Sequence, residues 1–152
     1  MQTIEIRIVK DDIAVLMESL LWKYGSSIAG AENFKQVYNT QSSRTSNAVD
    51  ARVINDSWEM RTQEALDIIR DFSPSVTEVA GEKTVSVQMS ARWAGTPLTL
   101  KQVLDQYIVD SMMVDWLTVT APSEAEKYVS RLVFDEKRIK ANVYSLKRPS
   151  IT

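Results

Sequence analysis

The last third of the chain constrains the fold most, because it contains two segments with strong helical patterning. In residues 98–118, apolar side chains recur every three or four positions, as they do on the buried face of a helix: Leu100, Val103, Leu104, Tyr107, Ile108 and Met112. The second half of this segment is apolar on nearly every side. We therefore expect it to form the central, most buried helix of the protein.

Two aspartates interrupt this apolar segment. Asp110 and Asp115 lie among residues that we expect to be buried, and a buried carboxylate is costly unless it is paired. Arg131, Lys137 and Arg138 on the following helix are candidate partners. Exposure at the margin of the helix is the simpler alternative.

The next segment predicts a helix that folds back on the first. Thr120-Ala121-Pro122 marks a turn, and Ser123 and Glu126 have the spacing of a capping box. Helical spacing continues to Leu146. Because the turn has only about four residues, the two helices should form an antiparallel hairpin. The hairpin alone buries too little apolar surface to offset the entropy of ordering it, so other helices must cover it, and any apolar face left over points to a subunit interface.

The N-terminal part predicts a strand followed by a helix. Residues 3–9 alternate between isoleucine and polar side chains, which is typical of a half-buried strand. Residues 12–24 have helical spacing, with Asp11 and Asp12 able to cap the helix.

The middle of the chain predicts another helix and another strand. The helix should start at Asn55 or Asp56 and stop at Ser73-Pro74. Its apolar stripe faces the core, and its charged residues are expected to face solvent: Glu59, Arg61, Glu64, Asp67 and Arg70. After a polar turn around Gly81, residues 85–93 alternate as a strand, which should pair with the first strand or with its counterpart in another copy.

Together these elements predict one domain of the α+β class, mainly α: an antiparallel helical bundle of about four helices with two short β-strands. The length of 152 residues suits a single domain. Residues 39–50 are polar and predict a flexible loop, and residues 147–152 form a basic C-terminal tail. We expect no membrane span and a cytoplasmic setting, because no run of eighteen apolar residues and no signal-like N-terminus is present.

Composition argues against catalysis. The chain has no cysteine and no histidine, so it cannot build Ser-His or Cys-His nucleophile pairs or the usual zinc sites. None of its four glycines has the spacing of a phosphate-binding loop. We expect no catalytic, cofactor or metal site and no small-molecule substrate. An enzyme that works through carboxylates, lysine or tyrosine is the weakest alternative.

Other residues that suggest chemistry have plainer interpretations. The acidic pairs Asp11/Asp12 and Glu124/Glu126 stand where helix N-termini favour negative charge. Trp58, Trp116 and Tyr128 could stack on bases, but they fall within apolar stripes and should pack in the core.

Positive charge is concentrated at the C-terminal end. Residues 137–152 contain five cations and no acid, a charge of +5, so the net charge of −2 leaves −7 for residues 1–136. These candidate contact residues for protein or DNA are Lys137, Arg138, Lys140, Lys147 and Arg148. The plainer explanation is that cations are favoured near a helix C-terminus.

Three segments carry a family resemblance: Asp115-Trp116-Leu117-Thr118-Val119-Thr120, then Glu124-Ala125-Glu126-Lys127-Tyr128, then the exit Val143-Tyr144-Ser145-Leu146-Lys147-Arg148-Pro149. This ending resembles the C-terminus of small virion proteins of Bacteroidetes phages and prophages. The helix-rich layout also resembles the head-tail connector proteins of tailed phages, which assemble as rings beneath the portal.

The resemblance implies a structural function in the virion. Copies would join head to tail in a closed ring, with portal and tail or neck proteins as partners and DNA passing through the middle. The five basic residues would contact acidic portal or tail surfaces, or would meet DNA without sequence specificity. The protein would be found in the virion, and in the host cytoplasm during assembly. The alternative is a non-enzymatic regulatory module that uses its basic C-terminal surface on nucleic acid or on an acidic protein.

Overall fold

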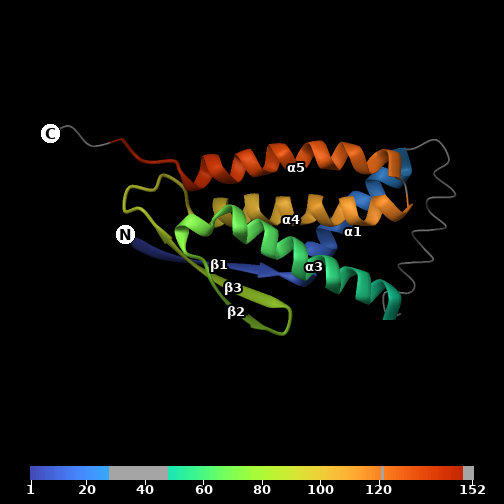
Figure 1. The fold of residues 1–152 in the computed structure, drawn as a ribbon, viewed down its shortest axis with the longest axis horizontal. Helices are drawn as coiled ribbons and strands as arrows, with labels where there is room; N and C mark the ends of the chain where they lie inside the picture. The colour runs from blue at the N-terminus through green and yellow to red at the C-terminus, as the bar shows by residue number, and fades with distance from the viewer. Residues whose placement is uncertain (28–47, 121, 149–152) are drawn as a thin grey trace.

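A computed structural model describes residues 1–27, 48–120 and 122–148 of the chain; for residues 18, 21–27, 48–55, 119 and 120 it describes the backbone only. Most of the predicted loop at residues 39–50, namely residues 39–47, therefore lies outside the described residues. The elements, in chain order, are β1 (Gln2–Val9), α1 (Lys10–Ser27), α3 (Ala48–Ile68), the 3-10 turn η1 (Arg70–Phe72), β2 (Ser75–Val79), β3 (Glu82–Met89), α4 (Pro97–Thr120) and α5 (Pro122–Val143), as Figure 1 shows.

The strands form an antiparallel sheet in the order β1-β3-β2. β3 pairs with β1, with Ile4 opposite Val87 and Ile6 opposite Val85, so the predicted pairing of the two strands within one chain is confirmed. The expectation of only two strands was wrong. Ser75–Val79 forms the third strand, β2, and pairs with β3.

A two-residue turn creates the additional hairpin. Ala80 and Gly81, between β2 and β3, both have positive φ, at 51° and 81°. This conformation suits the twist of a tight β-hairpin. The sequence Ser-Val-Thr-Glu-Val before the turn alternates as a strand does, so the signal for β2 was present in what we interpreted as a polar turn.

One face of the sheet and the helices share a single core. The isoleucines of β1 and the apolar residues of β3 are buried on the same face, and they meet α4, whose buried residues extend over five turns: Leu100, Leu104, Ile108, Val109, Met112, Met113 and Leu117. In Figure 1, α4 lies between the sheet and α5, and α5 runs antiparallel to it. The predicted central helix and the predicted hairpin are both confirmed.

The helix bounds differ from prediction at several places, most clearly in α3 and α5. α3 begins at Ala48, so residues 48–50 are helical rather than part of a loop, and Asn55 and Asp56 lie inside the helix instead of capping it. Alanine and arginine have good helix propensity, which allows the helix to extend upstream of the two polar residues. α5 begins at Pro122, a favoured first position, and ends at Val143 rather than continuing to Leu146.

The chain leaves α5 along a defined path. The Ala94 amide donates to the Ser145 carbonyl at 2.9 Å, and Lys147 donates to the Arg92 carbonyl at 2.6 Å. Trp93 and Leu146 form an isolated β-bridge. These backbone bonds explain why the helix stops before Leu146, because the exit pairs with the segment that follows β3.

The structure confirms the α+β class with mainly helical content. It does not confirm the expected bundle, since the described helices are layered on a sheet with α4 at the centre. Within the described ranges, no helix combines the length and the hydropathy needed to cross a membrane.

The central position of α4 gives a stability prediction. Leu104 is fully buried, whereas Leu98, at the start of the same helix, is 61% exposed. Leu104→Ala should lower the free energy of unfolding by about 2–5 kcal/mol, because it leaves a cavity in the core. Leu98→Ala should change it by less than about 0.5 kcal/mol. Urea unfolding followed by circular dichroism measures both, and equal effects would contradict the placement of α4.

Candidate functional site

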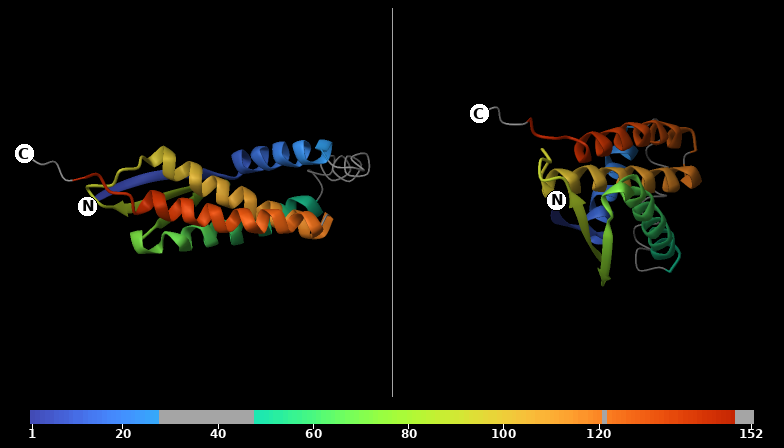
Figure 2. Two further views of the ribbon diagram at one scale, coloured as in Figure 1. Left: turned by 90° about the horizontal axis from the view of Figure 1, so that it is seen from above. Right: turned by 60° about the vertical axis from the view of Figure 1, so that its left-hand side comes forward.

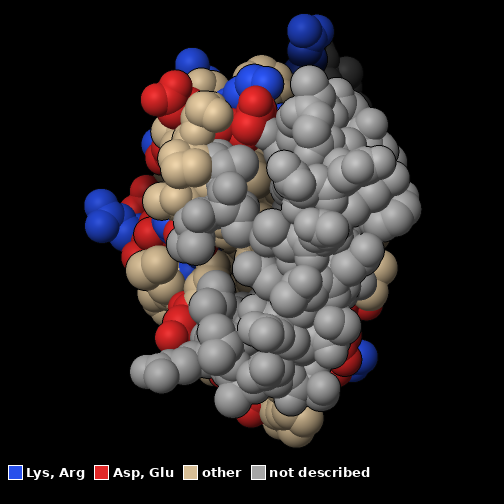
Figure 3. Space-filling model, turned by 90° about the vertical axis from the view of Figure 1, so that its right-hand side faces the viewer, with Lys and Arg blue, Asp and Glu red and all other residues tan. Residues whose placement is uncertain are grey.

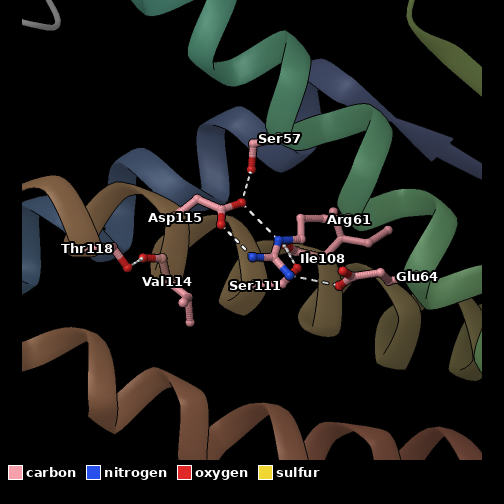
Figure 4. Close-up of polar contacts among 8 residues, drawn as sticks. All are labelled: Ser57, Arg61, Glu64, Ile108, Ser111, Val114, Asp115 and Thr118. Carbon is pink, nitrogen blue, oxygen red and sulfur yellow. Dashed lines mark hydrogen bonds and ion pairs between the residues drawn. The ribbon is translucent and has the colours of Figure 1, made fainter. Parts of the chain in front are cut away.

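The most strongly bonded polar cluster joins α3 to α4 (Figure 4). The guanidinium of Arg61 donates to both carboxylate oxygens of Asp115, from Nη2 at 2.5 Å and from Nε at 2.8 Å. The Ser57 hydroxyl also donates to Asp115, and Arg61 Nη1 donates to Glu64 at 2.8 Å. Two parallel bonds of this kind fix the orientation of both side chains as well as their distance.

The partner of Asp115 differs from the prediction. It is Arg61 on α3, which we expected to face solvent, and not a cation of α5. Burial alone would raise the pKa of Asp115, but the hydrogen bonds from Arg61 and Ser57 outweigh burial, so its pKa is lowered. The bond to Asp115 in turn raises the pKa of Arg61. The cluster therefore remains an ion pair at all ordinary pH values, and it acts as a structural tie.

Removing one partner of this tie should destabilise the fold. Asp115→Ala leaves the partly buried guanidinium of Arg61 with only Glu64, so we expect a loss of about 1–3 kcal/mol in the free energy of unfolding. Asp56→Ala, an exposed position on α3, is the matched control and should cost less than about 0.5 kcal/mol. Chemical denaturation measures both variants, and a loss no larger than that of the control would show that the pair contributes nothing.

A second acidic site lies in a cleft between α4 and α5. The cleft, of about 520 Å³, is lined by Gln106, Asp110, Ser130, Arg131, Phe134, Asp135 and Arg138. Asp110 and Asp135 are 1% and 5% exposed, and both border this cleft. Arg131 is the one predicted partner that approaches Asp110, at 4.0 Å, and Gln106 donates to Asp110 at 3.1 Å.

Asp135 has a strongly raised pKa. Burial and the hydrogen bond and charge of Asp110 raise the pKa of Asp135 to about 7, against the weaker opposing effect of Arg138 and Arg131. Like charges this close cannot both ionise without cost. Such a pair is the feature that the weakest alternative, a carboxylate enzyme, would need. However, both side chains are almost wholly buried, so we interpret the pair as a contact between helices.

Sequence reasoning missed Asp135. It stands in the run Phe134-Asp135-Glu136-Lys137, which reads locally as a solvated face. The signal that could have found it is spacing, because Asp135 lies seven residues after Tyr128 and four before Ile139, both of which are buried.

The raised pKa of Asp135 makes a pH-dependent prediction. Between the ordinary value of 3.8 and about 7, the unfolded chain has lost this proton while the folded chain keeps it. The contribution of Asp135 to the free energy of unfolding therefore falls as the pH rises from about 4 to about 7. Above about pH 7 this contribution stays constant. Asp135→Asn cannot ionise, and its amide can donate to Asp110. The free energy of unfolding of this variant, measured relative to wild type, should therefore rise by about 1–3 kcal/mol between pH 5 and pH 8.

The control for this prediction is Asp56→Asn, which makes the same chemical change at an exposed position. Its stability relative to wild type should stay constant over the same range. Thermal melts at several pH values provide the comparison. A pH-independent difference between Asp135→Asn and wild type would contradict the raised pKa of Asp135.

The five predicted contact residues do not form one patch. Lys140 is paired with Glu136 at 3.3 Å. Lys147 and Arg148 are exposed on the chain exit beside residues 92–94. Lys137 and Arg138 stand on α5, where both are exposed, and Arg138 also borders the cleft. Within the described part of the chain, Lys137 forms no ion pair.

Apolar side chains surround Lys137 and Arg138 on the outer surface of α5. Val129, Val133 and Phe134 are 49%, 55% and 63% exposed. Helical spacing places Val133, Phe134 and Lys137 on the side away from the buried Tyr128 and Ile139, with Val129 and Arg138 at its two margins. We call this surface, Val129, Val133, Phe134, Lys137 and Arg138, the α5 face. The spacing of these apolar residues predicts a helix but does not show which of them stay exposed.

Charge elsewhere is mixed. At the end of the molecule seen in Figure 3, the described rim shows basic atoms (blue) and acidic atoms (red) close together, not a patch of one sign. Among the described side chains, no group of three or more acidic residues is arranged to hold a metal ion. The α5 face is therefore the best candidate for a functional surface, since it combines exposed apolar area with unpaired charge.

Comparison of the chain with family models, curated proteins and solved structures finds no match.

Proposed function

We propose that this protein is a structural component of a phage virion, a head-tail connector or neck subunit that assembles as a ring between portal and tail. The observation that carries this proposal is the α5 face. Three large apolar side chains remain about half exposed on a regular, well-packed helix. Apolar surface rimmed by charge on a folded domain is typical of a protein-protein contact.

The chain exit supports the same proposal. The segments that carry the family resemblance lie at the end of α4, at the start of α5 and in the exit. The Tyr144 hydroxyl donates to Asp71 at 2.9 Å, and Arg92 donates to the Lys147 carbonyl at 2.8 Å. These contacts hold Lys147 and Arg148 at one place on the molecule, where a neighbouring portal or tail subunit can meet them.

A protein partner suits the α5 face better than DNA does. Binding to phosphate requires cations and gains nothing from apolar neighbours. Val133 and Phe134, which adjoin Lys137 and Arg138, would remain exposed to water beside a DNA backbone. In a protein interface the same residues would be buried and would contribute most of the affinity.

The alternative function is a monomeric or dimeric regulatory module whose basic C-terminal surface binds nucleic acid or an acidic protein. It is favoured by the two exposed cations of the exit, Lys147 and Arg148. The two functions differ in oligomeric state and in the effect of salt, because phosphate contacts weaken steeply as salt rises.

The proposed function predicts assembly that depends on the α5 face. Purified protein at rising concentration, or with the portal of the same phage, should form closed rings visible by negative-stain electron microscopy. Phe134→Ser should reduce the assembled fraction at least tenfold, since it removes a large apolar contact worth about 1.4 kcal/mol or more.

Leu98→Ser is the matched control, because Leu98 is 61% exposed and Phe134 is 63% exposed. It should leave assembly unchanged. A chain that remains monomeric under all these conditions, and that shifts DNA in a salt-sensitive manner, would replace the proposed function by the alternative.

A further inference from the structure

A second exposed surface, acidic and apolar, lies on α1. Asp11, Asp12, Val15, Leu16 and Ser19 are all exposed, and Val15 and Leu16 are 63% and 48% exposed. Helical spacing places these five residues on one side of α1. The opposite side carries Ile13 and Met17, which are buried in the core. We call this surface the α1 face.

The α1 face and the α5 face are complementary. Each contains exposed aliphatic or aromatic side chains next to two charges, and the charges have opposite sign: Asp11 and Asp12 on α1, Lys137 and Arg138 on α5. Among the described residues, Asp11, Asp12 and Lys137 form no ion pair. Complementary charge around an apolar centre gives an interface its orientation and its selectivity.

The two faces cannot meet within one chain. Both α1 and α5 pack against α4, and each turns its exposed side away from its own buried residues. Figure 2 (left) shows α1 and α5 on different sides of α4. A contact between these faces must therefore join two molecules.

From this geometry we propose that the α1 face of one copy binds the α5 face of the next. The inference rests on the proposed function and specifies its subunit contact. Because the two surfaces are different, the contact is heterologous, and repeating it generates a ring where the rotation closes. Every copy in such a ring uses both faces, and the neighbouring copies cover the exposed apolar residues of each face.

Charge reversal tests the pairing. Asp12→Lys and Lys137→Glu should each weaken assembly about tenfold, because each places like charges opposite each other. The double variant, with both changes in one chain, should recover most of the loss, since every contact then contains the same pair with its signs exchanged. Mixing the two single variants should also restore assembly, because an alternating ring contains only natural and exchanged pairs.

Control variants distinguish an effect on the interface from a general effect of charge or a loss of folding. Asp56→Lys and Arg70→Glu make the same charge changes at exposed positions outside both faces and should leave self-assembly unaffected. Thermal melts of all variants show whether each is folded. Analytical ultracentrifugation at low and high salt gives the assembled fraction.

The possible failures are distinguishable. If wild type forms rings but Asp12→Lys and Lys137→Glu behave like the controls, or if the double variant is no better than the singles, the pairing is overturned and the proposed function stands. If wild type forms no multimer alone or with portal, the proposed function fails, and the pairing fails with it.

Discussion

The apolar surface of α4 is the constraint on which the rest of the structure depends. Its second half is apolar on nearly every side, so no single layer can cover it. The sheet, α1, α3 and α5 each contact it from a different direction. A helix that must be surrounded fixes the order of the layers, and the elements that surround it then turn their remaining surfaces outward. The positions of the α1 and α5 faces on different sides of the molecule follow from this requirement.

Two of the aspartates on α4, Asp110 and Asp115, contribute polar contacts to the helices packed on either side of it. Asp115 receives a guanidinium from α3, and Asp110 faces a second carboxyl group from α5. The first contact is an ion pair with both carboxylate oxygens bonded, so it fixes α3 in register. The second includes Asp135, whose pKa is raised to about 7, so this contact weakens when Asp135 ionises. The contact between α4 and α5 is therefore the one whose polar part responds to pH near neutrality.

Much of the fold could be predicted from the sequence because its signals are local and periodic. The isoleucines of β1, the stripe of α4 and the turn before α5 each identify an element without reference to the others. β2 was missed because it is short and each of its residues is exposed, so the alternation in its sequence corresponds to no buried face. Arg61 and Asp135 were missed for a different reason, since each is charged and stands among charged neighbours. Their burial depends on which helix lies opposite, and that is a tertiary fact that spacing alone does not give.

Only part of the α5 face could be predicted from the sequence, because the exposure of a helical residue also depends on which element lies opposite. Lys137 and Arg138 were identified from the run of positive charge. Of the other members of that run, Lys140 lies on α5 but is paired with Glu136, and Lys147 and Arg148 lie on the chain exit. Helical spacing alone does not separate the apolar residues of the α5 face from those of the core. α5 has more apolar positions than its contact with α4 can cover. That excess is itself informative. A helix that buries Tyr128, Ile139 and Val143 on one side and still exposes Val133 and Phe134 on the other has two apolar sides, and the described part of the chain covers only one of them. Apolar surface that stays in contact with water costs free energy. The proposed contact with a neighbouring copy would remove this cost.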